Sequence, residues 1–373
     1  MTVTVPFAAF DRRYHDWVDD VIEVVAEVAA SDEFILKSRV AKLEAQIAAL
    51  IGARHAVACA SGTGGLTLIL AALGLGRGDE VVTPAFSFIS SASTIALVGA
   101  TPVFADVSLD TATLDPVTAE AAITGATQAL LPAHLFSCAA PMAALRALAD
   151  RRGLRLIENS AVTFGGTVDG RPTGRYGDAG VFSFFPAKPL GGCGDAGMVV
   201  TDDDDLAAAC RALRNHGQGA ERFRHELVGF NCRMDEVTAG FLLRRLPTLT
   251  DQLTARRRLA QRYHEQLHPL APSVVPPPGD FTGRAVYTYV VRAQDRDGLR
   301  AFLASRGVET VVSYPRPLHL QPAFAHLGHR PGDFPNAERL AHECLALPLY
   351  PEMPAADVDR VAAAVADFYG SRS

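Results

Sequence analysis

A single lysine stands between an aromatic run and a glycine-rich loop. In the stretch VFSFFPAKPLGGCGDAG (181–197), Lys188 follows Phe184 and Phe185 and precedes four glycines. A lysine among aromatic side chains loses hydration, and glycines lose much backbone entropy on folding. Because both costs need a compensating gain, Lys188 is a candidate for covalent chemistry with a carbonyl group.

Two further segments could hold an anion near this lysine. The turn ASGTGG (60–65) follows one predicted strand and opens a predicted helix, where backbone N–H groups and the helix dipole favour a phosphate. By itself, such a turn is also typical of an ordinary helix cap. Ser183 ends another predicted strand and could add its hydroxyl group to the same anion.

Phe88 and Asn159 are two further candidates for binding the same ligand. Phe88 lies just beyond the apolar run TPAF and could offer a flat face to a ring, although a core position is equally consistent with its type. Asn159 ends the strand LRLIEN, where a polar group would touch a ligand at the sheet edge. Pyridoxal phosphate needs a lysine, an anion pocket, a stacking aromatic ring and a partner for its pyridine nitrogen. The residues therefore indicate pyridoxal 5'-phosphate.

These side chains lie at or near the ends of apolar runs, and the runs alternate with segments whose apolar residues have the period of a helix. The predicted strands are 56–61, 80–86, 101–107, 128–135, 154–159, 179–184 and 197–201, and helical segments lie at 65–75, 90–98, 139–152 and 203–214. Most of the runs are continuously apolar, as expected for strands that helices bury on both faces. This pattern predicts an α/β domain with a mainly parallel seven-stranded sheet, whose ligands sit at the carboxyl ends of the strands.

A smaller α+β domain is expected to follow. A helical stretch after residue 235 leads to the PPPG turn at 276–279, and a strand at 287–293 and helices near 297–306, 335–345 and 355–369 come after it. We expect residues 1–245 to form the large domain, including an N-terminal arm, and residues 246–373 to form the small domain.

Composition narrows the class of protein. Of the 373 residues 49% are hydrophobic and 20% charged, which is typical of a soluble globular protein. A net charge of −6 gives no electrostatic reason to expect nucleic acid or an anionic membrane as a partner. The six cysteines are scattered without metal-like spacing, and the N-terminus lacks the features of a signal peptide, so we expect a cytoplasmic protein.

No metal site is expected. The acidic run TDDDDL (201–206) is read as the opening of a helix, and the basic run 255–264 as the solvated face of another. His319, His326 and His329 lack the spacing and acidic partners of a zinc site, and they are assigned to the substrate rim and the surface.

Several motifs in order resemble the DegT/DnrJ/EryC1/StrS family of aminotransferases, over nearly the whole chain. They are SGTGGL, GDEVVTPAFSF, VGATPVFADV, IENSAVTFGG, FSFFPAKPLGGCGDAG, LRNHG, GFNCRMDE, LHLQPAF and FPNAERLAHECLALPLYPEM. The resemblance implies a fold-type I pyridoxal-phosphate transferase. It also implies transfer of an amino group from glutamate or glutamine to a keto sugar, mostly nucleotide-linked, in a sugar or natural-product pathway.

The resemblance also implies roles for individual residues. Lys188 would carry the cofactor covalently, and Phe88 would stack on its ring. Gly62, Thr63 and Ser183 would bind the cofactor phosphate, and Asn231 would reach the phosphate of a neighbouring subunit, which implies at least a homodimer with shared sites. His216, Tyr314 and His319 resemble positions that line the keto-substrate pocket, and a polar core or surface position is the alternative for these three.

The sequence departs from the family where the cofactor ring is held. The usual pattern Glu-Asp-Ala-Ala-Gln, whose Asp pairs with the pyridine nitrogen, is here Glu158, Asn159, Ser160, Ala161 and Val162. A neutral amide cannot hold that nitrogen protonated through charge. Glu158 is a poor substitute, because adjacent strand residues face opposite sides of the sheet. Gly64 also replaces an Asp that is common in the family's SGTDAL turn.

Three interpretations remain open from the sequence. The first is an aminotransferase that tolerates Asn159. The second is a pyridoxal-phosphate enzyme with changed chemistry, such as an elimination. The third is a non-catalytic subunit that partners an active relative, against which Lys188 argues.

Overall fold

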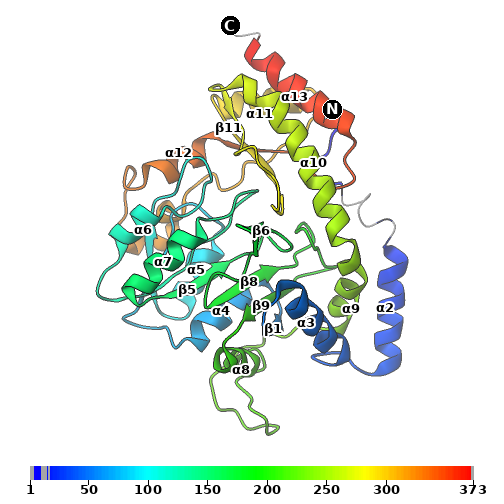
Figure 1. Cartoon of the computed structure of the whole chain (residues 1–373), viewed down its shortest axis with the longest axis vertical. Helices are drawn as coiled ribbons and strands as arrows, with labels where there is room; N and C mark the ends of the chain where they lie inside the picture. The colour runs from blue at the N-terminus through cyan, green and yellow to red at the C-terminus, as the bar shows by residue number, and fades with distance from the viewer. Residues whose placement is uncertain (1–3, 10–14, 16, 371–373) are drawn as a thin grey trace.

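The computed structural model describes residues 4–9, 15 and 17–370, and a seven-stranded sheet forms its centre (Figure 1). In spatial order the strands are β1 (His55–Cys59), β9 (Gly197–Thr201), β8 (Ala179–Ser183), β5 (Arg155–Asn159), β4 (Thr127–Leu130), β2 (Glu80–Pro84) and β3 (Thr101–Ala105). The pairs among β8, β5, β4, β2 and β3 are parallel, and β9 runs antiparallel to both of its neighbours. The expected fold class, a mainly parallel seven-stranded α/β sheet, is confirmed.

Helices cover both faces of this sheet, which is why its strands are continuously apolar. One face packs against α4 (Gly62–Ala72), α5 (Ser90–Leu97) and α8 (Asp204–Leu213). The other packs against α3 (Ser38–Ile51), α6 (Pro116–Ala122), α7 (Met142–Arg152) and α9 (Glu236–Arg245). The helix α2 (Val18–Ser31) lies outermost, against α9 (Figure 1). A short hairpin joins β6 (Thr167–Val168) to β7 (Arg171–Pro172).

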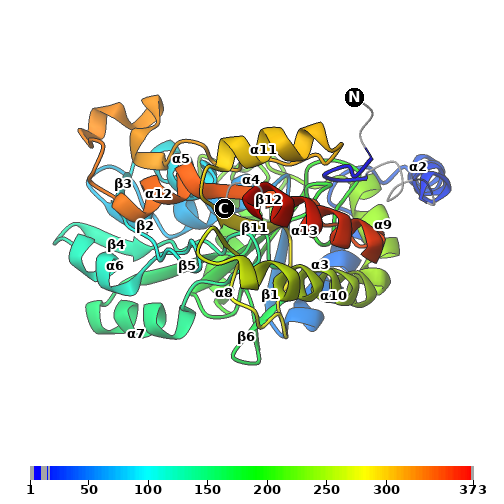
Figure 2. The ribbon, with the colours of Figure 1, turned by 90° about the horizontal axis from the view of Figure 1, so that it is seen from above.

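The long helix α10 (Leu249–Leu267) leads from the sheet domain to a second layer (Figures 1 and 2). Its antiparallel sheet consists of β10 (Val274–Val275), β11 (Tyr289–Ala293) and β12 (Cys344–Leu347). The remaining elements are α11 (Arg296–Ser305), α12 (Pro335–Glu343), α13 (Ala355–Gly370) and four 3-10 turns at 246–248, 268–270, 318–320 and 322–327. A hydrophobic core of its own joins α10, α11 and α13 to this small sheet.

Two details differ from the sequence expectations. Val5 and Ala9, placed in the large domain by the expected 1–245 division, pack in the second core, and Val5 bridges to Val308. The position of the boundary between the two domains, at residue 245, stays a prediction. The predicted helix 335–345 ends at Glu343, because Cys344 begins β12. Within the described residues, every helix is too short or too polar to cross a lipid bilayer.

Candidate active site

A cavity of about 480 Å³ opens at the carboxyl ends of the central strands. Seven of the ten predicted site residues line it, namely Gly62, Thr63, Phe88, Asn159, Ser183, Lys188 and Tyr314. They come from five separate segments of the chain, so the topology of the sheet brings them together. This is the position at which open α/β sheets bind their ligands.

Lys188 enters the cavity from a tight loop after β8. The loop is closed by hydrogen bonds from the Lys188 N–H to the Phe185 carbonyl (2.8 Å) and from the Gly192 N–H to the Phe184 carbonyl (2.7 Å). A Cβ at Gly191 would lie 2.1 Å from the carbonyl oxygen of Pro186, so glycine is required there. Burial lowers the pKa of Lys188 to about 8, because the surroundings disfavour its ammonium form.

The predicted anion site lies at the N-terminus of α4. Ser61 caps this helix, and its Oγ accepts a hydrogen bond from the Gly64 N–H (3.0 Å). A Cβ at Gly62 would lie 2.9 Å from the Cβ of Ser183, so glycine allows the turn to approach the end of β8 closely. The first N–H groups of α4 and the Ser183 hydroxyl thus border one cavity with Lys188, which fits the phosphate and the carbonyl group of pyridoxal phosphate.

Asn159 is buried and held by its own chain. Its Nδ2 donates to Ser91 Oγ (3.1 Å), and its Oδ1 accepts from the Ala161 N–H (3.2 Å). Ser91 Oγ in turn lies 3.0 Å from the Oγ of Ser87. The amide can therefore offer its second hydrogen to a ligand in the cavity, whereas the apolar side chain of Val162 offers no such group.

Glu158 points to the other side of β5, as expected from the alternation of a strand. It accepts hydrogen bonds from His134 Nε2 (2.8 Å) and from the N–H groups of Gly174 and Tyr176. Burial raises the pKa of Glu158, but these hydrogen bonds outweigh burial and hold the pKa below its usual value. Glu158 therefore cannot take the place of an aspartate at residue 159.

Aromatic side chains form one wall of the cavity. Phe88 is 52% exposed, which is unusual for a core phenylalanine and leaves its ring open to a ligand. The ring of Tyr314 stacks on Phe136, with centroids 5.9 Å apart, and meets Phe86 edge-on. Tyr314 has a left-handed backbone with φ of +57°, a costly conformation for a bulky residue that occurs most often at functional sites.

Three predicted residues lie away from this cavity in the single chain. His216 and Asn231 are exposed at the two ends of a loop that extends beyond α8 (Figure 1). His319 also lies apart from the cavity: it is 1% exposed, its Nε2 lies 3.2 Å from Glu338 Oε1, and its ring packs on Phe334. Because Glu338 lies on α12 and Phe334 directly precedes that helix, His319 packs against the start of α12, and its role in the substrate pocket stays a prediction.

The structure also adds residues that the sequence analysis missed. His134, Asp195 and Tyr287 line the cavity. Asp195 could have been found, because it lies in the glycine-rich loop already identified. Tyr287 just precedes β11 in the second layer, where it looked like an ordinary strand residue, and only the tertiary fold places it 4.2 Å from Lys188 Nζ, measured to the ring centroid.

The chain is similar to several known proteins. The sequence matches the DegT/DnrJ/EryC1/StrS aminotransferase family over residues 16–366. The UDP-N-acetyl-3-dehydro-alpha-D-glucosamine 3-aminotransferase of Acidithiobacillus ferrooxidans is 39% identical over 98% of each chain. The crystal structure of Streptomyces venezuelae DesV in complex with a ketimine intermediate is similar with a TM-score of 0.93, at 38% identity over 98% of each chain. NtdA from Bacillus subtilis with bound cofactor PMP has a TM-score of 0.92, at 30% identity over 99% of this chain and 86% of its own.

Proposed function

The chain belongs to the DegT/DnrJ/EryC1/StrS aminotransferase family, and from this premise we propose that it aminates a ketone carbon of a nucleotide-linked sugar. It is a pyridoxal-phosphate-dependent transferase of nitrogenous groups. We propose glutamate or glutamine as the amino donor. The observation that carries the proposal is the position of Lys188, which lines one cavity together with the N-terminus of α4 and an exposed aromatic ring.

In this proposal each residue has a distinct task. Lys188 holds the cofactor covalently, and the N-terminal N–H groups of α4, at Gly62 and Thr63, bind its phosphate together with Ser183. Phe88 packs on the ring, and Asn159 hydrogen-bonds to the ring nitrogen. Pyridoxal phosphate, when bound, supplies the electron sink for removal of a proton from the donor's α-carbon.

Lys188 is also suited to move that proton. With a pKa of about 8, a useful fraction of the free side chain is neutral near pH 7 and can accept a proton. The same side chain, once protonated, can return the proton to the neighbouring carbon during the exchange. An unburied lysine would be almost wholly charged at this pH.

We infer the class of the amino acceptor from the substrates of related enzymes. The name of the Acidithiobacillus enzyme specifies a keto sugar attached to UDP. The volume of the cavity, about 480 Å³, and its aromatic wall are compatible with a sugar ring beside the cofactor. We propose a keto-sugar nucleotide for this chain, within a sugar or natural-product pathway in the cytoplasm. The cytoplasmic location is supported by the six cysteines, which all lie in the described residues and form no disulfide there.

We further propose that the active unit is a homodimer. Asn231 is exposed on the loop beyond α8, where Phe223 is 75% and Val228 97% exposed. Exposed apolar side chains on one projecting loop favour contact with another protein surface. A second copy would cover them and would bring Asn231 to the phosphate site of its neighbour.

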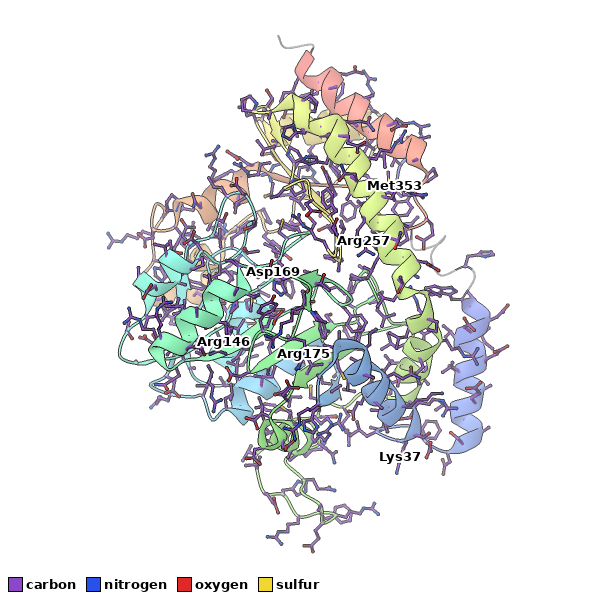
Figure 3. The ribbon with its side chains drawn as sticks, viewed as in Figure 1. Lys37, Arg146, Asp169, Arg175, Arg257 and Met353 are labelled. Carbon is purple, nitrogen blue, oxygen red and sulfur yellow. The ribbon has the colours of Figure 1, made fainter. Side chains whose placement is uncertain are left out.

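Chemical trapping tests the assignment of Lys188. Borohydride treatment of the protein with pyridoxal phosphate should fix the cofactor to the peptide that contains Lys188, and Lys188→Ala should abolish both the label and turnover. The chain has only three lysines, and Lys37 and Lys42 are exposed, with Lys37 at the outer edge beside α3 (Figure 3). A label on Lys37 or Lys42, or no label, would overturn the assignment.

The acceptor is tested with a panel of keto-sugar nucleotides and glutamate or glutamine. Mass spectrometry should show conversion of a carbonyl group to an amine for at least one member. A pyridoxal-phosphate enzyme with changed chemistry, such as an elimination, is the second candidate, because the amide of Asn159 weakens the electron sink. Loss of a substituent without gain of nitrogen would favour that candidate.

A further inference from the structure

Tyr287 places an aromatic face against the amine of Lys188. The Nζ atom lies 4.2 Å from the ring centroid, which is within the range of a cation–π contact. Tyr287 lines the same cavity as Lys188 but comes from the segment before β11, about a hundred residues further along the chain. The contact therefore joins the second layer to the reactive lysine.

The backbone at Tyr287 is fixed by a buried arginine. Arg256, on α10, is 2% exposed, and its Nη1 donates to the carbonyl oxygens of Tyr287 (3.0 Å), Val286 (3.4 Å) and Leu349 (3.3 Å). Hydrogen bonds from a charged donor are among the stronger ones in proteins. The backbone that carries the ring is thus held by α10, whose Arg256 also bonds to the chain after β12.

We propose that Tyr287 is a positioning residue, which holds the amine of Lys188 over the cavity and stabilises its ammonium form whenever that amine is free. This inference rests on the proposed function, in which Lys188 is released from the cofactor during each half-reaction. It gives the second layer a part in the proton transfer, through its effect on Lys188. The other titratable side chains that line the cavity are His134, Asp195 and Tyr314.

The effect opposes that of burial. Burial disfavours the ammonium form and lowers the pKa of Lys188, whereas the negative face of an aromatic ring attracts the ammonium group and raises the pKa. Removal of the ring should therefore lower the pKa further below 8. A cation–π contact of ordinary strength corresponds to a shift of about 0.5 to 1 pH unit.

The test is a titration of Lys188 by nuclear magnetic resonance. The full-length protein is labelled with [ε-13C]lysine, and the shift of each of the three lysine signals is followed against pH, with Lys188→Met used to assign the signal. Measurements are made on the pyridoxamine-phosphate form, in which Lys188 is a free amine, and on the cofactor-free chain. Tyr287→Leu removes the ring, Tyr287→Phe keeps it, and Tyr314→Leu is the matched control that opens the same cavity elsewhere.

We expect the pKa of Lys188 to fall by about 0.5 to 1 unit in Tyr287→Leu and to stay close to wild type in Tyr287→Phe and Tyr314→Leu. The inference is overturned if Tyr287→Leu leaves the pKa unchanged or raises it, or if Tyr314→Leu lowers it equally. Because the cofactor-free titration needs no turnover, this result is separate from the fate of the proposed function. Failure of borohydride to label Lys188 would overturn the function and leave the titration result intact.

Discussion

In the proposed function, the amide of Asn159 takes the place of a carboxylate that would hold a proton on the ring nitrogen of the cofactor. One amide hydrogen is donated to Ser91, and the oxygen accepts from Ala161. The second hydrogen can be donated to a ring nitrogen only if that nitrogen is unprotonated. We therefore expect a largely neutral pyridine ring at pH 7 and a weakened electron sink.

Asn159→Asp should restore the charge interaction. An opposite charge at contact distance moves a pKa by about 1–3 units, so the ring nitrogen should become protonated near neutral pH. The half-reaction with glutamate should then accelerate, and each tenfold gain in rate corresponds to a barrier lowered by about 1.4 kcal/mol. Pre-steady-state absorbance of the cofactor, from pH 6 to pH 9, measures this rate.

Asn159→Ala is the control for simple loss of the side chain, and it should not accelerate the reaction. Faster reaction of the Asp variant with the native product retained would support an aminotransferase that works with a weakened sink. Faster reaction with loss of that product would favour changed chemistry. Identical spectra and rates in wild type and Asn159→Asp would show that Asn159 does not hydrogen-bond to the ring nitrogen.

Single residues could be predicted best where a motif fixes both the strand end and the direction of the side chain. Lys188, Ser183 and Asn159 each follow an apolar run, so the sequence places them at one sheet edge. His319 had no such constraint. Its contact with Glu338 depends on how α12 packs against the chain near residue 319. The spacing of residues around His319 in the sequence does not predict this packing.

At the scale of elements, the start of α4 packs against the strand-like segment that contains Cys232. A Cβ at Gly64 would lie 2.4 Å from Cys232 Sγ, and the Ala60 N–H donates to the Cys232 carbonyl (3.2 Å). Cys232 is 6% exposed and has little room to move. An aspartate at residue 64 would therefore collide with Cys232 unless that side chain moved.

Gly64→Ala should destabilise the protein despite the higher helix propensity of alanine. The methyl group gains up to about 1 kcal/mol as a helix former, but overpacking against a buried sulfur typically costs about 1–3 kcal/mol. We expect a net loss in the free energy of unfolding, measured with urea on the cofactor-free chain. Cys232→Ala should relieve the clash, so that the double variant is more stable than Gly64→Ala alone. Equal stability of wild type and Gly64→Ala would contradict the predicted contact.

Elements with a plain apolar period were predictable, whereas the helices α2 and α3 were not predicted. The seven central strands follow from buried runs that helices flank on both sides. The helices α2 and α3 begin after Trp17 and Lys37, neither of which caps its helix through a side chain, so the usual start signal is missing. The pattern of the run CLAL at 344–347 is compatible with a helix or a strand. This run forms the strand β12 because it pairs with β11.

At the scale of the whole molecule, the helix α2 carries an exposed apolar surface in addition to the one on the loop beyond α8. Val18, Ile22 and Val25 lie at i, i+4 and i+7 on α2 and are 54%, 60% and 47% exposed. The opposite side of α2 is tied to α9 by ion pairs of Arg244 with three acidic residues, so this apolar stripe faces outward from a fixed helix. Two exposed apolar surfaces favour association of copies, with closed twofold symmetry as the usual outcome.

Mixing of two inactive chains tests whether the sites are shared. Lys188→Ala lacks the lysine of its own site, and Asn231→Asp should repel the phosphate of the neighbouring site through its negative charge. A hybrid dimer then has one site with both changes and one site with neither. Equal amounts of the two chains should recover about a quarter of the wild-type activity, because half of the dimers are hybrids with one working site each. Each variant alone is the control, and exchange of differently tagged chains is verified by pull-down. Verified exchange without any recovery of activity would show that Asn231 acts within its own chain, and the shared site would have to be abandoned.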